Sequence, residues 1–321
     1  MRVTLGFDTS CYTTSAAAVN EHGDVVAFSR MLLPVKQGER GLRQSEAVFA
    51  HVKQMPLVMA GLYEQLKTLE HEIVAVCASA TPRDEKDSYM PVFMVGMGHA
   101  RVLSEVLDVP LFETSHQQGH VAAGLIGHSR PDETFVALHL SGGTTELLAC
   151  GNEDLTLLGG CADLHAGQVV DRVGVAMGLP FPAGPHLEKL AMQFEGKAES
   201  LLPVSIEKGS LTCHLSGVET RAQQWIKEGK MSHEKIAAEI FDVLARTVAR
   251  LLVGAAQKTG AKKALVVGGV ASSTLLREQL IQRIAKQRCG LKVMFGQPQY
   301  SADNAAGVAA IGMRRYLEQT R

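Results

Sequence analysis

Several features that would assign this chain to a common class are missing from its sequence. Its six cysteines are scattered and form no C-x-x-C pair, which argues against a zinc ribbon or a disulfide framework. The formal net charge is only −1, so no overall field attracts nucleic acid or an anionic membrane. No apolar run approaches the roughly 18 residues of a membrane span, and the N-terminal segment becomes polar at Asp8, too early for a signal peptide. We therefore expect a cytoplasmic protein.

Two widespread phosphate-binding motifs are also absent. The sequence contains neither G-x-x-x-x-G-K-[ST] nor G-x-G-x-x-G after a predicted strand, which argues against P-loop and Rossmann folds. What remains is an ordinary globular composition, with 46% apolar and 20% charged residues over a length of 321. That length predicts two domains rather than one core.

The expected elements occur twice in the same order. Short apolar runs separated by turn residues predict strands at residues 3–7, 15–19 and 25–29, and again at 135–140, 145–150 and 155–158. Each set is followed by alternating strands and helices, including a long helix over 45–69 that Pro56 kinks or splits. The pattern predicts two related α/β lobes, the first formed by residues 1–112 with about 300–321 and the second by 113–299.

Three turns are candidates for nucleotide contact. They are Asp8-Thr9-Ser10, Ser141-Gly142-Gly143-Thr144-Thr145 and Val267-Gly268-Gly269-Val270. Paired glycines let the backbone approach an anion, although a glycine pair after a strand is most often only a tight turn. Three such turns in this order are typical of a two-lobed fold, and they predict phosphates on glycine-rich turns in the cleft between the lobes.

A pair of histidines is the sharpest local motif. On a helix, His116 and His120 lie one turn apart on one face, where two imidazoles can hold one metal ion if a third ligand, such as a carboxylate, comes from elsewhere. The same spacing also occurs in histidines that only make hydrogen bonds. Gln117 stands where the metalloprotease motif H-E-x-x-H has glutamate, so a metal here would organise anionic substrate oxygens rather than cleave peptides.

A local basic patch is the remaining route to RNA in a chain without net charge. The candidates are Arg283, Lys286, Arg288 and Lys292, with Arg314 and Arg315 further along the chain. A solvated helix face explains such a run equally simply, so both interpretations stay open.

In combination, these segments resemble the family of tRNA N6-threonylcarbamoyladenosine transferases (the TsaD type, also the catalytic subunit of the KEOPS complex). The motifs that carry the resemblance run in order from Gly6-Phe7-Asp8-Thr9-Ser10-Cys11 through residues 115–120, 140–143, 163–171, 182–185, 215–217 and 268–270 to Asp303-Asn304. The resemblance covers essentially the whole chain. It implies the α/β actin-like ATPase (ASKHA) fold, with two related lobes and a nucleotide cleft between them.

The resemblance also implies an acyltransferase that modifies tRNA. In the family, a threonylcarbamoyl group moves from threonylcarbamoyl-AMP to N6 of the adenosine beside the anticodon in ANN-decoding tRNAs. It implies one divalent metal ion (iron or zinc, or else magnesium) held by His116, His120 and Asp303, and a catalytic first turn containing Asp8 and Ser10. The residues that align with nucleotide-binding positions are His139, Leu140, Ser141, Gly142, Gly143, Asp171, Gly184, Gly268, Gly269 and Ser273. The implied partners are ATP, AMP or threonylcarbamoyl-AMP, tRNA, and further subunits that include an actin-like paralogue.

The chain departs from the family pattern at several polar positions. The departures are at Tyr12, Thr13, Thr144, Gln168, Glu219 and Ser273, and in the charged segment 81–87, which replaces a glycine-rich one. Two other functions therefore stay open. One is a nucleotide-binding regulatory paralogue without transfer activity, and the other is a small-molecule kinase or carbamoyl-handling enzyme on the same scaffold, with Asp8 or Asp171 as the base.

Overall fold

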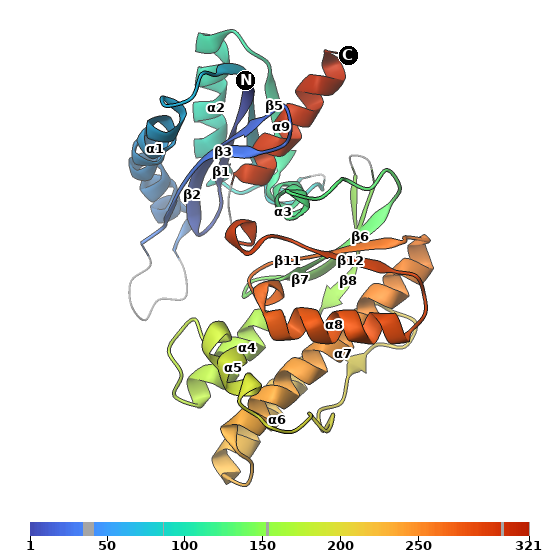
Figure 1. The fold of residues 1–321 in the computed structure, drawn as a ribbon. Helices are drawn as coiled ribbons and strands as arrows, with labels where there is room; N and C mark the ends of the chain where they lie inside the picture. The colour runs from blue at the N-terminus through green and yellow to red at the C-terminus, as the bar shows by residue number, and fades with distance from the viewer. Residues whose placement is uncertain (35–41, 86, 152–153, 303–304, 321) are drawn as a thin grey trace. The chain divides into compact units, whose positions relative to one another are not determined.

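The computed structural model describes residues 1–34, 42–85, 87–151, 154–302 and 305–320. The chain divides into two compact units, each with its own sheet (Figure 1). Unit 1 comprises Met1–Ser129 and Gln299–Arg321, and unit 2 comprises Arg130–Pro298. In the described part of the chain, no helix is both long and apolar enough to span a membrane.

Unit 1 is built on a five-stranded sheet in the order β3-β2-β1-β4-β5. Its strands are β1 (Arg2–Thr9), β2 (Thr13–Asn20), β3 (Val25–Leu32), β4 (Glu72–Thr81) and β5 (Leu111–Ser115). The first three form an antiparallel meander, whereas β4 and β5 run parallel to β1. Every residue of β1 after Arg2 is buried, so both faces of this strand are covered.

Helices cover both faces of this sheet. The helices α1 (Gln44–Leu66) and α2 (Phe93–Leu107) share one buried cluster with the sheet, whereas α9 (Ala306–Gln319) packs on the other face beside α3 (His116–Leu125) (Figure 1). The helix α1 is not split at Pro56. A proline leaves the carbonyl four residues earlier without its N–H partner, and that residue, Val52, lies on the exposed face of the helix.

Unit 2 contains a seven-stranded sheet in the order β12-β11-β6-β7-β8-β10-β9. Its strands are β6 (Phe135–Leu140), β7 (Thr145–Cys150), β8 (Leu155–Cys161), β9 (Ser205–Ile206), β10 (Thr212–His214), β11 (Lys263–Val267) and β12 (Lys292–Phe295). As in unit 1, the first three form an antiparallel meander, and a parallel neighbour (β11) joins its first strand. The predicted repetition of the meander is therefore confirmed.

The core of unit 2 is organised around its longest helix. The helices are α4 (Ala166–Ala176), α5 (Gly184–Met192), α6 (Ser216–Glu228), α7 (His233–Thr259) and α8 (Thr274–Lys286). A single cluster of buried side chains joins all five to one face of the sheet. Ser232 caps the start of α7 through its side chain, and Gly260, in a left-handed conformation, ends the helix.

The boundary of unit 1 differs from the lobe boundary expected after residue 112. Strand β5 pairs in parallel with β4, and α3 packs against α9, so the contacts keep both elements in unit 1 through Ser129. The predicted return of the C-terminal helix to the first lobe agrees with the packing of α9 on β1, β2 and β4.

Candidate functional site

The turn after β1 is buried and fixed by side chains from distant elements. Thr9 Oγ1 donates to the carbonyl of Val92 at 2.8 Å and accepts from the N–H of Gly96 at 3.1 Å. His51 on α1 contacts the carbonyl of Ser10 through Nε2 at 2.8 Å. Burial lowers the pKa of His51 below its ordinary value, against the opposing effects of the Ser10 bond and the charge of Asp8. Asp8, Thr9 and Ser10 are therefore buried and held by hydrogen bonds.

Asp8 connects the turn to the histidine pair. Its side chain is fully buried, and Oδ1 lies 2.9 Å from Nδ1 of His116. Nε2 of His116 lies 3.0 Å from Nε2 of His120, and the two rings meet edge to face. The other carboxylate oxygen, Oδ2 of Asp8, is buried and has no hydrogen-bond partner among the described residues.

The start of α3 explains why the histidines face one another. Ser115 Oγ accepts from the N–H of Gln118 at 3.1 Å, and Gln118 Oε1 accepts from the N–H of Ser115 at 3.0 Å. This reciprocal capping box begins the helix at His116. His120 therefore lies one turn further along the same face, as predicted.

The carboxylate also determines which nitrogen of His116 carries the proton. An ionised carboxylate only accepts hydrogen bonds, so Nδ1 of His116 is the donor to Asp8, and in a neutral ring the unprotonated Nε2 faces Nε2 of His120. A carboxylate that orients the second nitrogen is the usual environment of a metal-bound histidine.

The histidine pair fits one part of a metal site. Two nitrogen ligands of a tetrahedral zinc ion lie about 3.3 Å apart when each Zn–N bond is about 2.0–2.1 Å, close to the 3.0 Å between the two Nε2 atoms. No group of three histidine, cysteine or acidic side chains within the described ranges is arranged to hold a metal. The third predicted ligand, Asp303, lies outside the described residues.

The turn after β6 differs from the turn after β1 because its glycines are exposed. A side-chain carbon at Gly142 or Gly143 would meet no atom within 4 Å. Ser141 closes the turn by donating its N–H to the carbonyl of Thr144 at 2.8 Å. The exposed peptide groups at the two glycines are therefore accessible to an anion.

The start of α4 lies directly against this turn. Gly167 donates its N–H to the carbonyl of Ser141 at 3.1 Å, and Ala166 donates its N–H to Oγ1 of Thr145 at 2.9 Å. The N-terminus of a helix carries a partial positive charge that favours anions. The turn and the helix end therefore form one anion-accepting surface within unit 2.

The turn after β11 meets the same end of β6. Gly268 has a φ of +102°, and a side-chain carbon there would lie 2.3 Å from the carbonyl oxygen of Leu140. Only glycine allows this approach. Strand register places Val267 opposite His139, so the residues predicted to hold the nucleoside and those predicted to hold the phosphates are neighbours. Ser273 follows and caps α8 through the N–H of Leu276 at 3.1 Å.

Asp171 on α4 contacts the start of α5. Its Oδ1 accepts from the N–H of Ala183 at 2.8 Å, and the N–H of Gly184 also donates to the carboxylate. Burial raises the pKa of Asp171 above its ordinary value, although the hydrogen bonds from the N–H groups of Ala183 and Gly184 act in the opposite direction. The predicted ribose contact and the predicted adenine contact are therefore adjacent.

The predicted site residues thus fall into two sets. Unit 1 holds Asp8, Ser10, His116 and His120. In unit 2 the turns 139–143 and 268–269 meet, Ser273 caps the helix that follows the second turn, and Asp171 contacts Ala183 and Gly184 at the start of α5. Sequence reasoning missed His51, which is invisible as a functional residue because it occupies an ordinary buried position of a helix.

The predicted basic patch includes residues with structural roles. Arg283 pairs with Asp242, a buried acid that also accepts from Nε of Arg246 at 2.7 Å. Arg315 donates to the carbonyl of Glu113 at 2.5 Å. These guanidinium groups are committed to protein partners, which leaves Lys286, Arg288 and Lys292 as the simpler candidates for phosphate contact.

A family model described as TsaD, tRNA N6-adenosine threonylcarbamoyltransferase, matches residues 35–310. Solved structures of similar fold include a ROK family glucokinase from Streptomyces griseus with glucose and AMPPNP (14% identity, 97% of this chain and 99% of that chain, TM-score 0.55). A second is the activator of the 2-hydroxyisocaproyl-CoA dehydratase from Clostridium difficile with ADPNP (14% identity, 99% of this chain and 97% of that chain, TM-score 0.53). A third is T. kodakarensis HypF (15% identity, 99% of this chain and 48% of that chain, TM-score 0.63). These likenesses confirm the actin-like fold.

Proposed function

The chain belongs to the TsaD family of tRNA N6-adenosine threonylcarbamoyltransferases, and we propose that it moves a threonylcarbamoyl group from threonylcarbamoyl-AMP to N6 of the anticodon-adjacent adenosine in ANN-decoding tRNAs. The observation that carries the proposal is the chain of contacts from Asp8 through His116 to His120. Its working state includes tRNA and partner subunits, among them an actin-like paralogue, in the cytoplasm.

His116, His120 and Asp303 are the residues that would hold a divalent metal ion in this proposal. When bound, such an ion supplies positive charge that stabilises the phosphate and carbamoyl oxygens of the adenylate. Asp8 accepts from Nδ1 of His116, so Nε2 is the nitrogen through which a neutral His116 ring would bind the ion. His51 and Thr9 hold the first turn in place through hydrogen bonds to the carbonyls of Ser10 and Val92.

The glycine turns of unit 2 would bind the adenylate. The phosphate would receive hydrogen bonds from the N–H groups of Gly142 and Gly143, beside the start of α4. Asp171 would orient the ribose. The adenine would lie between Gly184 and the turn at Gly268 and Gly269. The Streptomyces griseus glucokinase and the Clostridium difficile activator of the same fold carry AMPPNP and ADPNP, which supports an adenine nucleotide. Positioning rather than covalent catalysis supplies the rate.

A reconstituted transfer assay tests the proposal. It combines the chain and its partner subunits from the same organism with labelled threonine, bicarbonate, ATP and unmodified ANN-decoding tRNA. We expect label in the tRNA and a loss of label with His116→Ala. The control is His99→Ala, which should leave labelling unchanged, because His99 lies on α2 and its Nδ1 contacts the carbonyl of Val95. Absence of label, while the same partners are active with a standard family member, would contradict the proposal.

A nucleotide-binding regulatory paralogue is the second candidate, and the departures from the family pattern favour it. Gln168 Oε1 accepts from the N–H of His165 at 3.1 Å, Glu219 accepts from the side chain of Gln223, and Ser273 caps α8. These three replacement residues therefore have local structural roles. Binding of AMP without transfer of label in the assay above would select this function.

A further inference from the structure

Two cysteines that are distant in the sequence are neighbours in the sheet of unit 2. Cys161 ends β8, Cys213 lies in β10, and the two are register partners in a parallel pair. Neighbouring strands lie about 4.7–4.9 Å apart, within the Cα separation of about 4.4–6.8 Å that a disulfide spans. Register partners point to the same face of a sheet, so the Cys161 and Cys213 side chains are neighbours. The pair is therefore in a position to form a disulfide.

The surrounding backbone holds the two strands together at this point. A side-chain carbon at Gly159 would lie 2.3 Å from the carbonyl oxygen of Leu211, so only glycine permits the observed approach. The N–H groups of Gly160 and Ala162 donate to the carbonyls of Leu211 and Cys213, each at 3.0 Å. These two bonds lie on either side of Cys161 and fix its position relative to Cys213.

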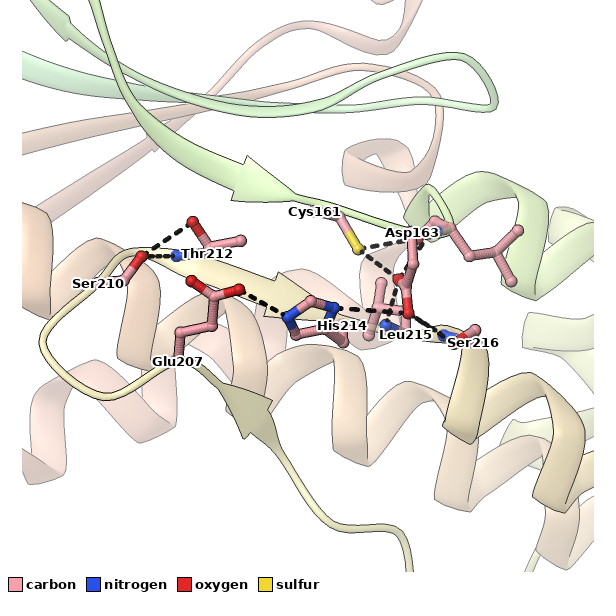
Figure 2. Close-up of polar contacts among 9 residues, drawn as sticks. Cys161, Asp163, Glu207, Ser210, Thr212, His214, Leu215 and Ser216 are labelled. Carbon is pink, nitrogen blue, oxygen red and sulfur yellow. Dashed lines mark hydrogen bonds and ion pairs between the residues drawn. The ribbon is translucent and has the colours of Figure 1, made fainter.

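The two sulfur atoms have different environments. Cys161 is partly exposed, whereas Cys213 is fully buried. Sγ of Cys161 lies 3.3 Å from Oδ1 of Asp163 and 3.0 Å from the carbonyl of Leu164 (Figure 2). An accessible sulfur beside a buried one is the arrangement of an attacking and a resolving cysteine.

The protonation of the pair supports the same assignment. The hydrogen bond from Cys213 lowers the pKa of Cys161 to about 7, and it outweighs burial and the nearby Asp163 carboxylate, which raise it. The same hydrogen bond, together with burial, raises the pKa of Cys213 far above its ordinary value. Of the two thiols, Cys161 is therefore the one that ionises more readily.

We propose that Cys161 and Cys213 form a redox modification site at which a peroxide oxidises the pair to a disulfide. The Cys161 thiolate attacks one peroxide oxygen, the O–O bond breaks, and a sulfenic acid and hydroxide result; the hydroxide takes up a proton to give water. Cys213 then loses its proton and attacks the sulfenic sulfur, which forms the S–S bond and releases a second water. Two thiols thus lose two electrons and two protons, and one peroxide becomes two water molecules.

Oxidation changes the contacts of a segment that leads directly into α4. Asp163 accepts from Oγ of Ser216 at 2.5 Å and from the N–H of Leu215 at 2.8 Å, and His214 lies between Asp163 and Glu207 (Figure 2). A disulfide would withdraw the Cys161 sulfur from this network. Because α4 begins against the Ser141 turn, we expect oxidation to weaken AMP binding about five- to tenfold. This consequence rests on the proposed function, whereas the disulfide itself does not.

Peptide mass spectrometry of the full chain tests the site. After hydrogen peroxide treatment and digestion without reductant, we expect a peptide that links Cys161 with Cys213, lighter by two hydrogens and cleaved by dithiothreitol. Cys161→Ser abolishes it, and Cys289→Ser, a change at an exposed cysteine, leaves it intact. Oxidation of Cys161 to sulfinic acid while Cys213 stays a thiol, or oxidation of Cys289 alone, would overturn the proposal.

Two measurements on the unmodified chain complete the test. Iodoacetamide should alkylate Cys161 with a midpoint near pH 7 and leave Cys213 unmodified in the folded protein; equal alkylation of both overturns the assignment of roles. AMP titration of reduced and oxidised protein then measures the coupling. Equal affinities would contradict the coupling alone, and an absence of AMP binding in the reduced protein would contradict the proposed function while the linked peptide still establishes the disulfide.

Discussion

The turn after β1 and the turn after β6 occupy corresponding places in the two meanders, but their environments are opposite. The first is buried, with Asp8 and Thr9 fully enclosed and Ser10 only 2% exposed. The second exposes Gly142 and Gly143, with no atom near the position of a side chain. One repeated supersecondary pattern thus provides a buried carboxylate beside two histidines in unit 1 and an open peptide surface in unit 2.

The difference has a physical cause in the side chains that follow each strand. In unit 1, the Thr9 hydroxyl forms hydrogen bonds with Val92 and Gly96, and Oδ1 of Asp8 contacts His116, so the partners come from distant parts of the chain. In unit 2, glycine has no side chain to satisfy, so its peptide groups stay available for a ligand. Burial makes the first turn suited to orienting other groups, and exposure makes the second suited to binding.

Loss of the buried carboxylate should give the largest effect. Asp8→Asn keeps the shape of the side chain but no longer forces the His116 proton onto Nδ1. We expect metal affinity and tRNA labelling to fall about 10- to 100-fold, as for other residues that orient a metal ligand. Zinc or iron titration and the transfer assay measure this. Asp24→Asn, in the exposed turn after β2, is the matched control; equal behaviour of both variants would contradict the role of Asp8.

A negative charge on the exposed turn should give the next largest effect. The Cβ atom that Gly142→Asp adds meets no described atom within 4 Å, so the free energy of unfolding should change by less than about 0.5 kcal/mol. Repulsion between the new carboxylate and the phosphate should weaken AMP binding about tenfold, equivalent to about 1.4 kcal/mol. Gly98→Asp, at an exposed position of α2, is the control in the same calorimetric titration. Unchanged AMP affinity in Gly142→Asp would remove this turn from the binding site.

The buried turn of unit 1 should also make stability depend on pH. The pKa of His51 is lowered below its ordinary value of about 6.5 in the folded chain, so the unfolded chain binds the extra proton first. The free energy of unfolding should therefore fall as pH decreases below about 6.5, by at most about 1.4 kcal/mol per pH unit for one group. Urea titrations at pH 7 and below measure this dependence. The free energy of unfolding should change less with pH in His51→Gln, and as much as in the original chain in His22→Gln.

A change at the exposed edge of the first turn should give the smallest effect. The Tyr12 side chain is 54% exposed, so Tyr12→Asp should shift the free energy of unfolding by less than about 0.5 kcal/mol. It restores one acidic group of the family pattern. A transfer rate that rises several-fold would support an active enzyme with a weakened site, and binding without any transfer in both forms would favour the regulatory function. Chemical denaturation and the labelling assay measure the two quantities.

The meanders and the long helices could be predicted because their signals are local. Short apolar runs between turn residues identified β1 to β3 and β6 to β8, and the predicted positions agree with the structure. The region 205–228 could not be predicted in the same way. The strands β9 and β10 contain two and three residues, too few for a periodic pattern, and their pairing depends on partners that are distant in the sequence.

The sequence by itself determined the family of this protein, its actin-like fold and the spacing of His116 and His120, because motif order and helical periodicity are properties of the chain. Only the tertiary structure decided that Asp8 contacts His116, which follows it by 108 residues, and that Cys161 meets Cys213 across two strands. Such pairs depend on strand order and on burial, which set the distances and protonation states of groups that no local pattern connects.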